Sequence, residues 1–208
     1  MVLNARQNLE IYGVLRKYMT EYVIQSWQQV WDDSYYLFEK IFESGFRPQI
    51  IVGIARGGWI PARLMADFFH TKQTANIKVE AYQTIGQSNE PVITQDILTN
   101  IKGKSVLVVD DVADSGATLQ AVLEDLQSRH PKEVKTAMLY YKPRSSLKPD
   151  FYIHDTSAWV IFSWSIFEAV SDLQNLWEKE GLSLDQIIEK CKTIGIPGPI
   201  INSYFKYY

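Results

Sequence analysis

The sequence predicts an α/β protein with a mainly parallel central sheet flanked by helices. Two continuous apolar runs, at residues 49–55 and 105–110, have the composition of strands that are buried on both faces, as in parallel sheets. Each run is followed by a stretch whose apolar residues have helical spacing, at about residues 59–69 and 116–129. This alternation of strands with helices is typical of parallel α/β folds.

The other elements are predicted from the same two periodicities. Residues 83–98 are polar, contain Gly86 and Pro91 and have no clear period, so they predict a long loop. A proline- and aromatic-rich segment begins at Pro143, and an aromatic tail follows the "GIPGP" run near the end of the chain. The remaining expected elements are strands at residues 22–24, 77–82 and 134–141 and helices at residues 4–20, 27–42 and 183–194.

Composition limits the class of protein. The 208 residues suffice for one domain with a substantial core, or for a domain with a small appendage. Apolar residues make up 46% of the chain, and a net charge of −3 implies no general affinity for nucleic acid or anionic membranes. Cys191 is the one cysteine, so no intramolecular disulfide can form. With no signal-like start and no apolar run of membrane-spanning length, we expect a cytoplasmic protein.

Two further classes of site find little support in the sequence. The three histidines, at positions 70, 130 and 154, lack the spacing of metal ligands. Residues 184–208 have a loose helix-turn-helix rhythm but only three basic residues, which argues against DNA binding. A helical packing or dimer element is the simpler interpretation of this segment.

The stretch "VLVVDDVADSGAT", residues 106–118, carries the main chemical signal. Its apolar run ends at Asp110 and Asp111, and ligands of open α/β sheets bind beyond the carboxyl ends of the strands. The small residues from Asp114 to Thr118 lead into a helix, whose N-terminus and uncovered N–H groups favour an anion. The pattern therefore predicts a phosphate cup beside two carboxylates, which suit sugar hydroxyls or a hydrated Mg²⁺.

Two other interpretations of this stretch are open. Asp114 or Ser115 could simply cap the following helix. A receiver domain also has a strand that ends in adjacent aspartates, but its acidic pair normally follows the first strand and needs no phosphate cup. Here at least two expected strands precede the pair.

The stretch resembles the ribosyl-phosphate-binding signature of type I phosphoribosyltransferases. The resemblance implies that Asp110 and Asp111 hold the 2- and 3-hydroxyls of 5-phosphoribosyl-1-pyrophosphate and, directly or through water, Mg²⁺. It also implies that Asp114 is a catalytic residue near purine N7, as a general base or as a partner for a proton on the ring. The 5-phosphate would be bound by the whole cup, which consists of Asp114, Ser115, Gly116, Ala117 and Thr118.

A second stretch, "ARGG" at residues 55–58, is similar to the pyrophosphate loop of the same family. Arg56 would grip the leaving pyrophosphate and assist catalysis, and Gly57 and Gly58 would let the backbone approach the ligand. In this family the peptide before the residue at position 56 is often cis. The loop at residues 83–98 corresponds to the family's flexible loop, which closes over the active site, although an ordinary surface loop is the alternative. Tyr82 would contact the donor there.

The segment "YYKPRSSLKPDFYIHDTSAWVIFSW" resembles the hood of purine members. Lys142 would donate a hydrogen bond to purine O6, Trp159 would stack on the ring, and Val160 would offer backbone groups to its edge. Core packing is the alternative role for Trp159. Where 6-oxopurine enzymes usually have an acidic residue that contacts the purine 2-substituent, this chain has Ser165. The acceptor, a 6-oxopurine or adenine, therefore stays open.

The resemblance implies a purine salvage enzyme, a pentosyltransferase that converts a purine base and 5-phosphoribosyl-1-pyrophosphate to a nucleoside 5-monophosphate and pyrophosphate. Dimers are common in the family, so a homodimer is expected, with neither nucleic acid nor membrane as a partner. A non-catalytic regulator that senses the ribosyl pyrophosphate is the alternative. The expected divisions are an N-terminal helical extension at 1–20, the core at 21–142, the hood at 143–168 and a C-terminal helical extension at 169–208.

Overall fold

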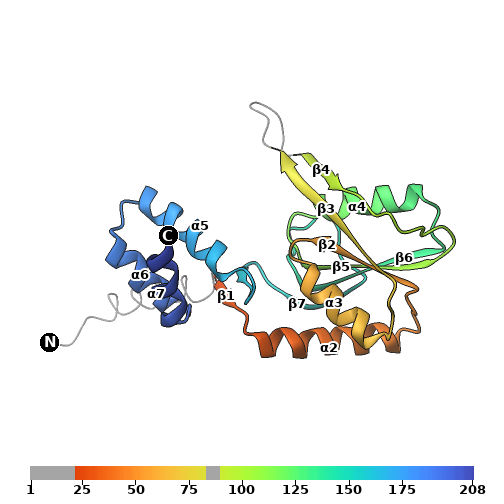
Figure 1. Ribbon diagram of the computed structural model, residues 1–208, viewed down its shortest axis with the longest axis horizontal. Coiled ribbons are helices and arrows are strands. Elements are labelled where there is room, and N and C mark those ends of the chain that lie inside the picture. The colour runs from red at the N-terminus through yellow and green to blue at the C-terminus, as the bar shows by residue number, and fades with distance from the viewer. Residues whose placement is uncertain (1–21, 83–89) are drawn as a thin grey trace. The chain divides into compact units, whose positions relative to one another are not determined.

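The computed structural model describes residues 22–82 and 90–208, and for Ala81, Tyr82 and Glu90 it describes the backbone only. Within the described chain there are two compact units (Figure 1). The larger one comprises residues 28–157, and the smaller one comprises residues 22–27 together with 158–208. The expected helix at residues 4–20 lies outside the described residues. Each unit is described by itself below.

The larger unit is built on a six-stranded sheet in the order β4-β3-β2-β5-β6-β7. Only β3 and β4 pair antiparallel, so the predicted mainly parallel sheet is confirmed. Its strands are β2 (Ile50–Ala55), β3 (Thr74–Tyr82), β4 (Glu90–Gln95), β5 (Ser105–Ala113), β6 (Glu133–Tyr141) and β7 (Phe151–Asp155).

Helices cover both faces of this sheet. Figure 1 shows α2 (Trp27–Glu43) and α3 (Trp59–Phe68) on one face and α4 (Ala117–Ser128) on the other. All residues of β2 are buried, and so are the first residues of β5, which explains why both strands read as unbroken apolar runs. Side chains of these strands and of α4 form one hydrophobic core, which includes Val52, Val108 and Leu119.

The prediction of a long loop at residues 83–98 is wrong for its second half. Residues 90–95 form β4, which pairs antiparallel with β3 at the edge of the sheet. A proline within the strand is compatible with this edge position, since an edge strand leaves some N–H groups without a ladder partner. The first half of the segment, residues 83–89, lies outside the described residues.

Strand β5 runs three residues further than its apolar pattern predicts. Its pairing with β6 continues through Asp110, opposite Met138, to Ala113, opposite Tyr141. Both carboxylates of the acidic pair are therefore held on a rigid strand, and only Asp114 and the residues after it belong to the connection to α4. The predicted helix at 116–129 is confirmed as α4.

The smaller unit is helical, with a two-stranded parallel ladder between β1 (Tyr22–Ile24) and β8 (Trp159–Ile161). Three helices, α5 (Ile166–Lys179), α6 (Leu184–Thr193) and α7 (Gly198–Tyr207), bury Trp177, Ile187 and Cys191 in a common core. The capping box that begins α6 is present, with Ser183 and Gln186 bonded reciprocally. Helices α5 and α7 were not predicted individually, since the sequence predicted only a helical extension over residues 169–208 and the helix at 183–194 within it. Among the described helices, none is both long and apolar enough to cross a membrane.

Candidate active site

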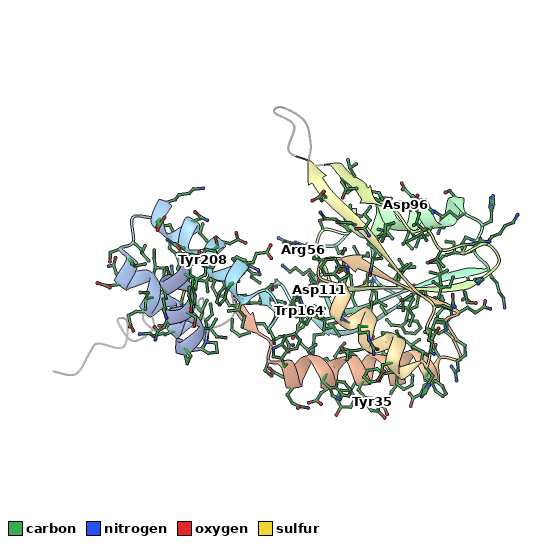
Figure 2. All side chains as sticks on the ribbon, viewed as in Figure 1. Tyr35, Arg56, Asp96, Asp111, Trp164 and Tyr208 are labelled. Atoms are coloured by element: carbon green, nitrogen blue, oxygen red, sulfur yellow. The ribbon has the colours of Figure 1, made fainter. Side chains whose placement is uncertain are left out.

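The glycine-containing turn at residues 55–58 and the acidic end of the stretch at residues 106–118 meet at one end of the six-stranded sheet. Strands β2 and β5 are parallel neighbours, with Gly53 opposite Val109, so the residues that follow them arrive at the same edge. Figure 2 shows Arg56 and Asp111 at this end of the larger unit. The peptide between Ala55 and Arg56 is cis, as expected from the family resemblance.

The glycines of the 55–58 turn are required by the protein's own packing. A Cβ placed on Gly57 would overlap the Asp111 carboxyl group, with the carboxyl carbon only 2.5 Å away. A Cβ on Gly58 would lie 2.6 Å from the carbonyl oxygen of Ile54 and would overlap that of Val109. Both glycines therefore allow the turn to lie directly against the end of β5, which brings Arg56 close to the acidic pair.

Asp110 and Asp111 form a pair of carboxyl groups with shifted acidity. The Asp111 N–H donates to Asp110 Oδ1 at 2.9 Å. Burial, followed by the charge of Asp111, raises the pKa of Asp110 well above its ordinary value, and burial raises the pKa of Asp111 to about 6. Two acids that are difficult to ionise together favour a ligand with positive charge or hydroxyl donors.

The connection from β5 to α4 has the geometry of an anion cup. Gly116 has a φ of 88° immediately before α4, a conformation that favours glycine. The first turn of an α-helix has N–H groups that no helix carbonyl accepts, and its dipole attracts negative charge. The Ser115 hydroxyl accepts the Ala117 N–H at 3.3 Å.

Asp114, the first residue of the cup, is held by two cations from the segment after β6. Lys142 Nζ donates to Asp114 Oδ2 at 3.1 Å, and Arg144 Nε donates to Oδ1 at 2.7 Å. A second guanidinium nitrogen of Arg144 also contacts Oδ1. Partial burial acts to raise the pKa of Asp114, but the hydrogen bonds from Arg144 and Lys142 outweigh it, and the pKa is lowered.

Comparison with known proteins assigns this arrangement to a family. The sequence pattern of the phosphoribosyl transferase domain matches residues 23–171. The chain belongs to the phosphoribosyl transferase family. The predicted fold class and the predicted family, one of transferases, are confirmed.

Several similar proteins are named as phosphoribosyltransferases of purine bases. The chain is 31% identical over 146 residues to a xanthine-guanine phosphoribosyltransferase of Gluconobacter oxydans. The aligned region covers 69% of this chain and 84% of that protein. A purine phosphoribosyltransferase from Pyrococcus horikoshii superposes with a TM-score of 0.64 at 38% identity and covers 69% of this chain and 93% of that one. A Helicobacter pylori xanthine-guanine-hypoxanthine phosphoribosyltransferase gives 0.64 at 28% identity, with 76% and 99% covered.

The geometry of this phosphoribosyl transferase domain separates two interpretations of Asp114. Its carboxylate caps no helix, because α4 begins without a side-chain capping hydrogen bond, and its two oxygens contact Lys142 and Arg144 instead. The residue that precedes α4 is Gly116, which offers no side chain. The capping alternative is therefore wrong for Asp114 and holds in part for Ser115, whose hydroxyl bonds within the turn.

Arg144 is the site residue that the sequence analysis missed. It lies two positions after Lys142 on the exposed turn "KPRSS", where an arginine would ordinarily be a solvated surface residue. The available signal was its place beside Lys142, which the family resemblance had already assigned to the acceptor site.

The same turn also holds the connection at residues 114–118, the predicted phosphate cup. The Lys142 N–H donates to the Ala113 carbonyl at 2.9 Å, and the Ser146 N–H donates to the Ser115 carbonyl at 2.9 Å. A Cβ on Gly116 would lie 2.5 Å from the Ser146 hydroxyl, so glycine is needed there for close packing as well as for its φ. The connections after β5 and β6 thus form one structural piece.

The predicted hood residues Trp159, Val160 and Ser165 belong to the smaller unit. The Trp159 ring is partly buried and lies 6.0 Å from that of Tyr22, and Val160 is buried in β8. Ser165 precedes α5, and its N–H donates to the Phe162 carbonyl at 3.0 Å. Roles for Trp159 and Val160 at a purine stay predictions, as does a donor contact for Tyr82, whose side chain lies outside the described structure.

Proposed function

We propose that this protein is a purine phosphoribosyltransferase that transfers the ribosyl phosphate of 5-phosphoribosyl-1-pyrophosphate to a 6-oxopurine, in purine salvage. The observation that carries the proposal is the contact between Lys142 Nζ and Asp114 Oδ2, beside the anion cup. A cation and a carboxylate at this distance can recognise the O6 and N7 positions of a 6-oxopurine together. The names of two relatives, a xanthine-guanine and a xanthine-guanine-hypoxanthine phosphoribosyltransferase, support the same acceptor class.

The ribosyl donor is held in this proposal by the strand ends. The cup at residues 114–118 binds the 5-phosphate through backbone N–H groups, the Ser115 and Thr118 hydroxyls and the dipole of α4. Asp110 and Asp111 accept hydrogen bonds from the ribose hydroxyls. Arg56 donates to the pyrophosphate from the turn that packs on Asp111.

Bond formation needs a proton acceptor at the base. As the purine N9 attacks C1 of the ribose, the C1–O bond breaks and its electron pair leaves with the pyrophosphate. The purine N7 proton passes to Asp114, whose lowered pKa keeps it ionised at neutral pH. Arg56 stabilises the charge that develops on the leaving group.

The donor set fits magnesium. Mg²⁺ prefers carboxylate oxygens and substrate phosphates and keeps several waters, and Asp110 and Asp111 offer carboxylates with raised pKa values that a cation would lower. When bound, Mg²⁺ would neutralise charge on the pyrophosphate.

A pyrophosphate-release assay with four purines in parallel tests the proposal. We expect release with hypoxanthine, guanine and xanthine and little with adenine. Hypoxanthine should be used at least as well as the other two, because the family resemblance matches Ser165 to the position at which 6-oxopurine enzymes usually have an acidic residue for the 2-substituent. Lys142→Met should reduce use of the 6-oxopurines, while Lys148→Met, further along the same connection between β6 and β7, should not.

The opposite results are equally informative. Release with adenine alone would overturn the 6-oxopurine assignment. Binding of the ribosyl pyrophosphate without release with any purine would overturn catalysis and favour the sensing regulator.

A further inference from the structure

Arg144 contacts the proposed catalytic carboxylate of Asp114, but the function proposed above gives it no role. Its guanidinium reaches Asp114 from the turn after β6 and contacts one oxygen, Oδ1, while Lys142 holds the other. The carboxylate is therefore fixed at both ends. Rotation about its Cβ–Cγ bond would break one or both contacts.

The two cations differ in their surroundings. Lys142 is buried at 7% exposure, whereas the Arg144 side chain is 68% exposed, so Arg144 can move into solvent at small cost. Oδ1 is the oxygen that the exposed partner holds, so it is the oxygen that a base arriving from solvent could share. Arg144 is therefore placed to align Oδ1 and then to share it with the base.

The backbone around Asp114 does not depend on the Arg144 side chain. The Lys142 N–H to Ala113 carbonyl bond and the Ser146 N–H to Ser115 carbonyl bond join the two connections by main-chain groups. Removal of the guanidinium should therefore leave the anion cup intact. This separation allows a functional effect to be distinguished from a folding effect.

We propose that Arg144 is a positioning residue, which fixes the Asp114 carboxylate in the orientation that accepts the proton of the acceptor base. The inference rests on the proposed phosphoribosyl transfer to a purine. Donor binding should not depend on Arg144, because the cup binds the 5-phosphate through backbone N–H groups and hydroxyls, and main-chain hydrogen bonds hold its backbone. Lysine at position 144 would supply the charge from a similar distance but with a single nitrogen, and should keep part of the effect.

The test compares Arg144→Ala and Arg144→Lys with the matched control Lys148→Ala, which removes a cation from the same connection between β6 and β7. For Arg144→Ala we expect a fall in kcat on the order of tenfold, because misplacement of a catalytic group costs up to about a hundredfold and Lys142 still holds one oxygen. The KM for the ribosyl donor and the Tm should be unchanged. Arg144→Lys should recover much of kcat, and Lys148→Ala should match the wild type.

The outcomes separate this inference from the proposed function. An active wild type with an equally active Arg144→Ala variant overturns the positioning role alone. A fall in kcat that comes with weaker donor binding or a lower Tm also overturns it, since a structural role explains that result. A wild type that releases no pyrophosphate with any purine overturns the proposed function and the positioning role with it.

Discussion

The carboxyl group of Asp111 occupies the space into which a side chain at position 57 would project. The end of β5 and the turn after β2 are thus fitted to one another without any ligand between them. Gly57 is then a residue whose replacement acts on the neighbouring strand end and through it on the donor site.

Gly57→Ala should weaken donor binding. The added methyl group must displace Asp111 or shift the turn that carries Arg56, and we expect the KM for the ribosyl pyrophosphate to rise at least tenfold, which corresponds to about 1.4 kcal/mol. Steady-state kinetics with the donor varied will measure it. Gly198→Ala is the matched control, because a Cβ there meets nothing within 4 Å. An unchanged KM in Gly57→Ala would contradict the observed packing.

Asp114→Asn should lower turnover much more than donor affinity. The amide cannot take up the purine proton, so kcat should fall by about 10²- to 10⁴-fold, while the KM for the ribosyl pyrophosphate changes little. Kinetics with both substrates varied in turn will separate the two effects. Equal turnover of variant and wild type would remove Asp114 from the catalytic role.

The acidic pair should make the protein less stable as the pH rises from about 4 to about 6. The pKa of Asp111 is about 6 in the folded protein, above its ordinary value, so the folded state keeps a proton that the unfolded chain has already released. A shift of this size corresponds to at most about 3 kcal/mol. Denaturant unfolding across this range should show a flatter pH profile for Asp111→Asn, and a higher stability than the wild type at pH 7.

The network of contacts around Arg129, away from the candidate active site, should matter for stability alone. Arg129 on the α4 side of the sheet binds Asp125 at 2.9 Å, Asp96 and the Ile97 carbonyl at 3.2 Å, and so joins the end of α4 to the segment after β4. Arg129→Ala should cost about 1–2 kcal/mol of unfolding free energy.

Arg63→Ala provides the comparison for this network. Arg63 also pairs with an aspartate four residues away, Asp67, but both side chains are largely exposed, so the cost should stay below about 0.5 kcal/mol. Chemical denaturation of both variants gives the two values, and equal losses would mean that the Arg129 network adds nothing.

The strands and the acidic end of β5 could be predicted because buried parallel strands have a strong apolar pattern and end at the ligand edge. Strand β4 could not be predicted in the same way. It is an edge strand with Pro91 near its start, and its signal is only the alternation of partly buried Ile93 with exposed Val92 and Thr94. Such a weak pattern is easily taken for a loop.

The contacts of the site were less predictable than its residues. Gly57 and Gly58 were expected to admit a ligand, and the structure shows that they admit Asp111 and Val109 of the protein itself. Sequence reveals that a position needs glycine, but not which atoms approach it. Asp114 and Lys142 were each predicted at the purine, whereas their direct contact, and the part of Arg144 in it, depend on two connections that meet only in the folded sheet.

The smaller unit shows that the boundary of the family pattern is not a boundary of folding. The pattern ends at residue 171, in the middle of α5. Strand β8, which carries Trp159 and Val160, has Ile161 buried in the same core as Trp177 and Ile201, which lie beyond that end. A chain cut at residue 171 would lose the core residues against which this strand packs. A minimal enzyme cut from this chain must therefore keep its last three helices.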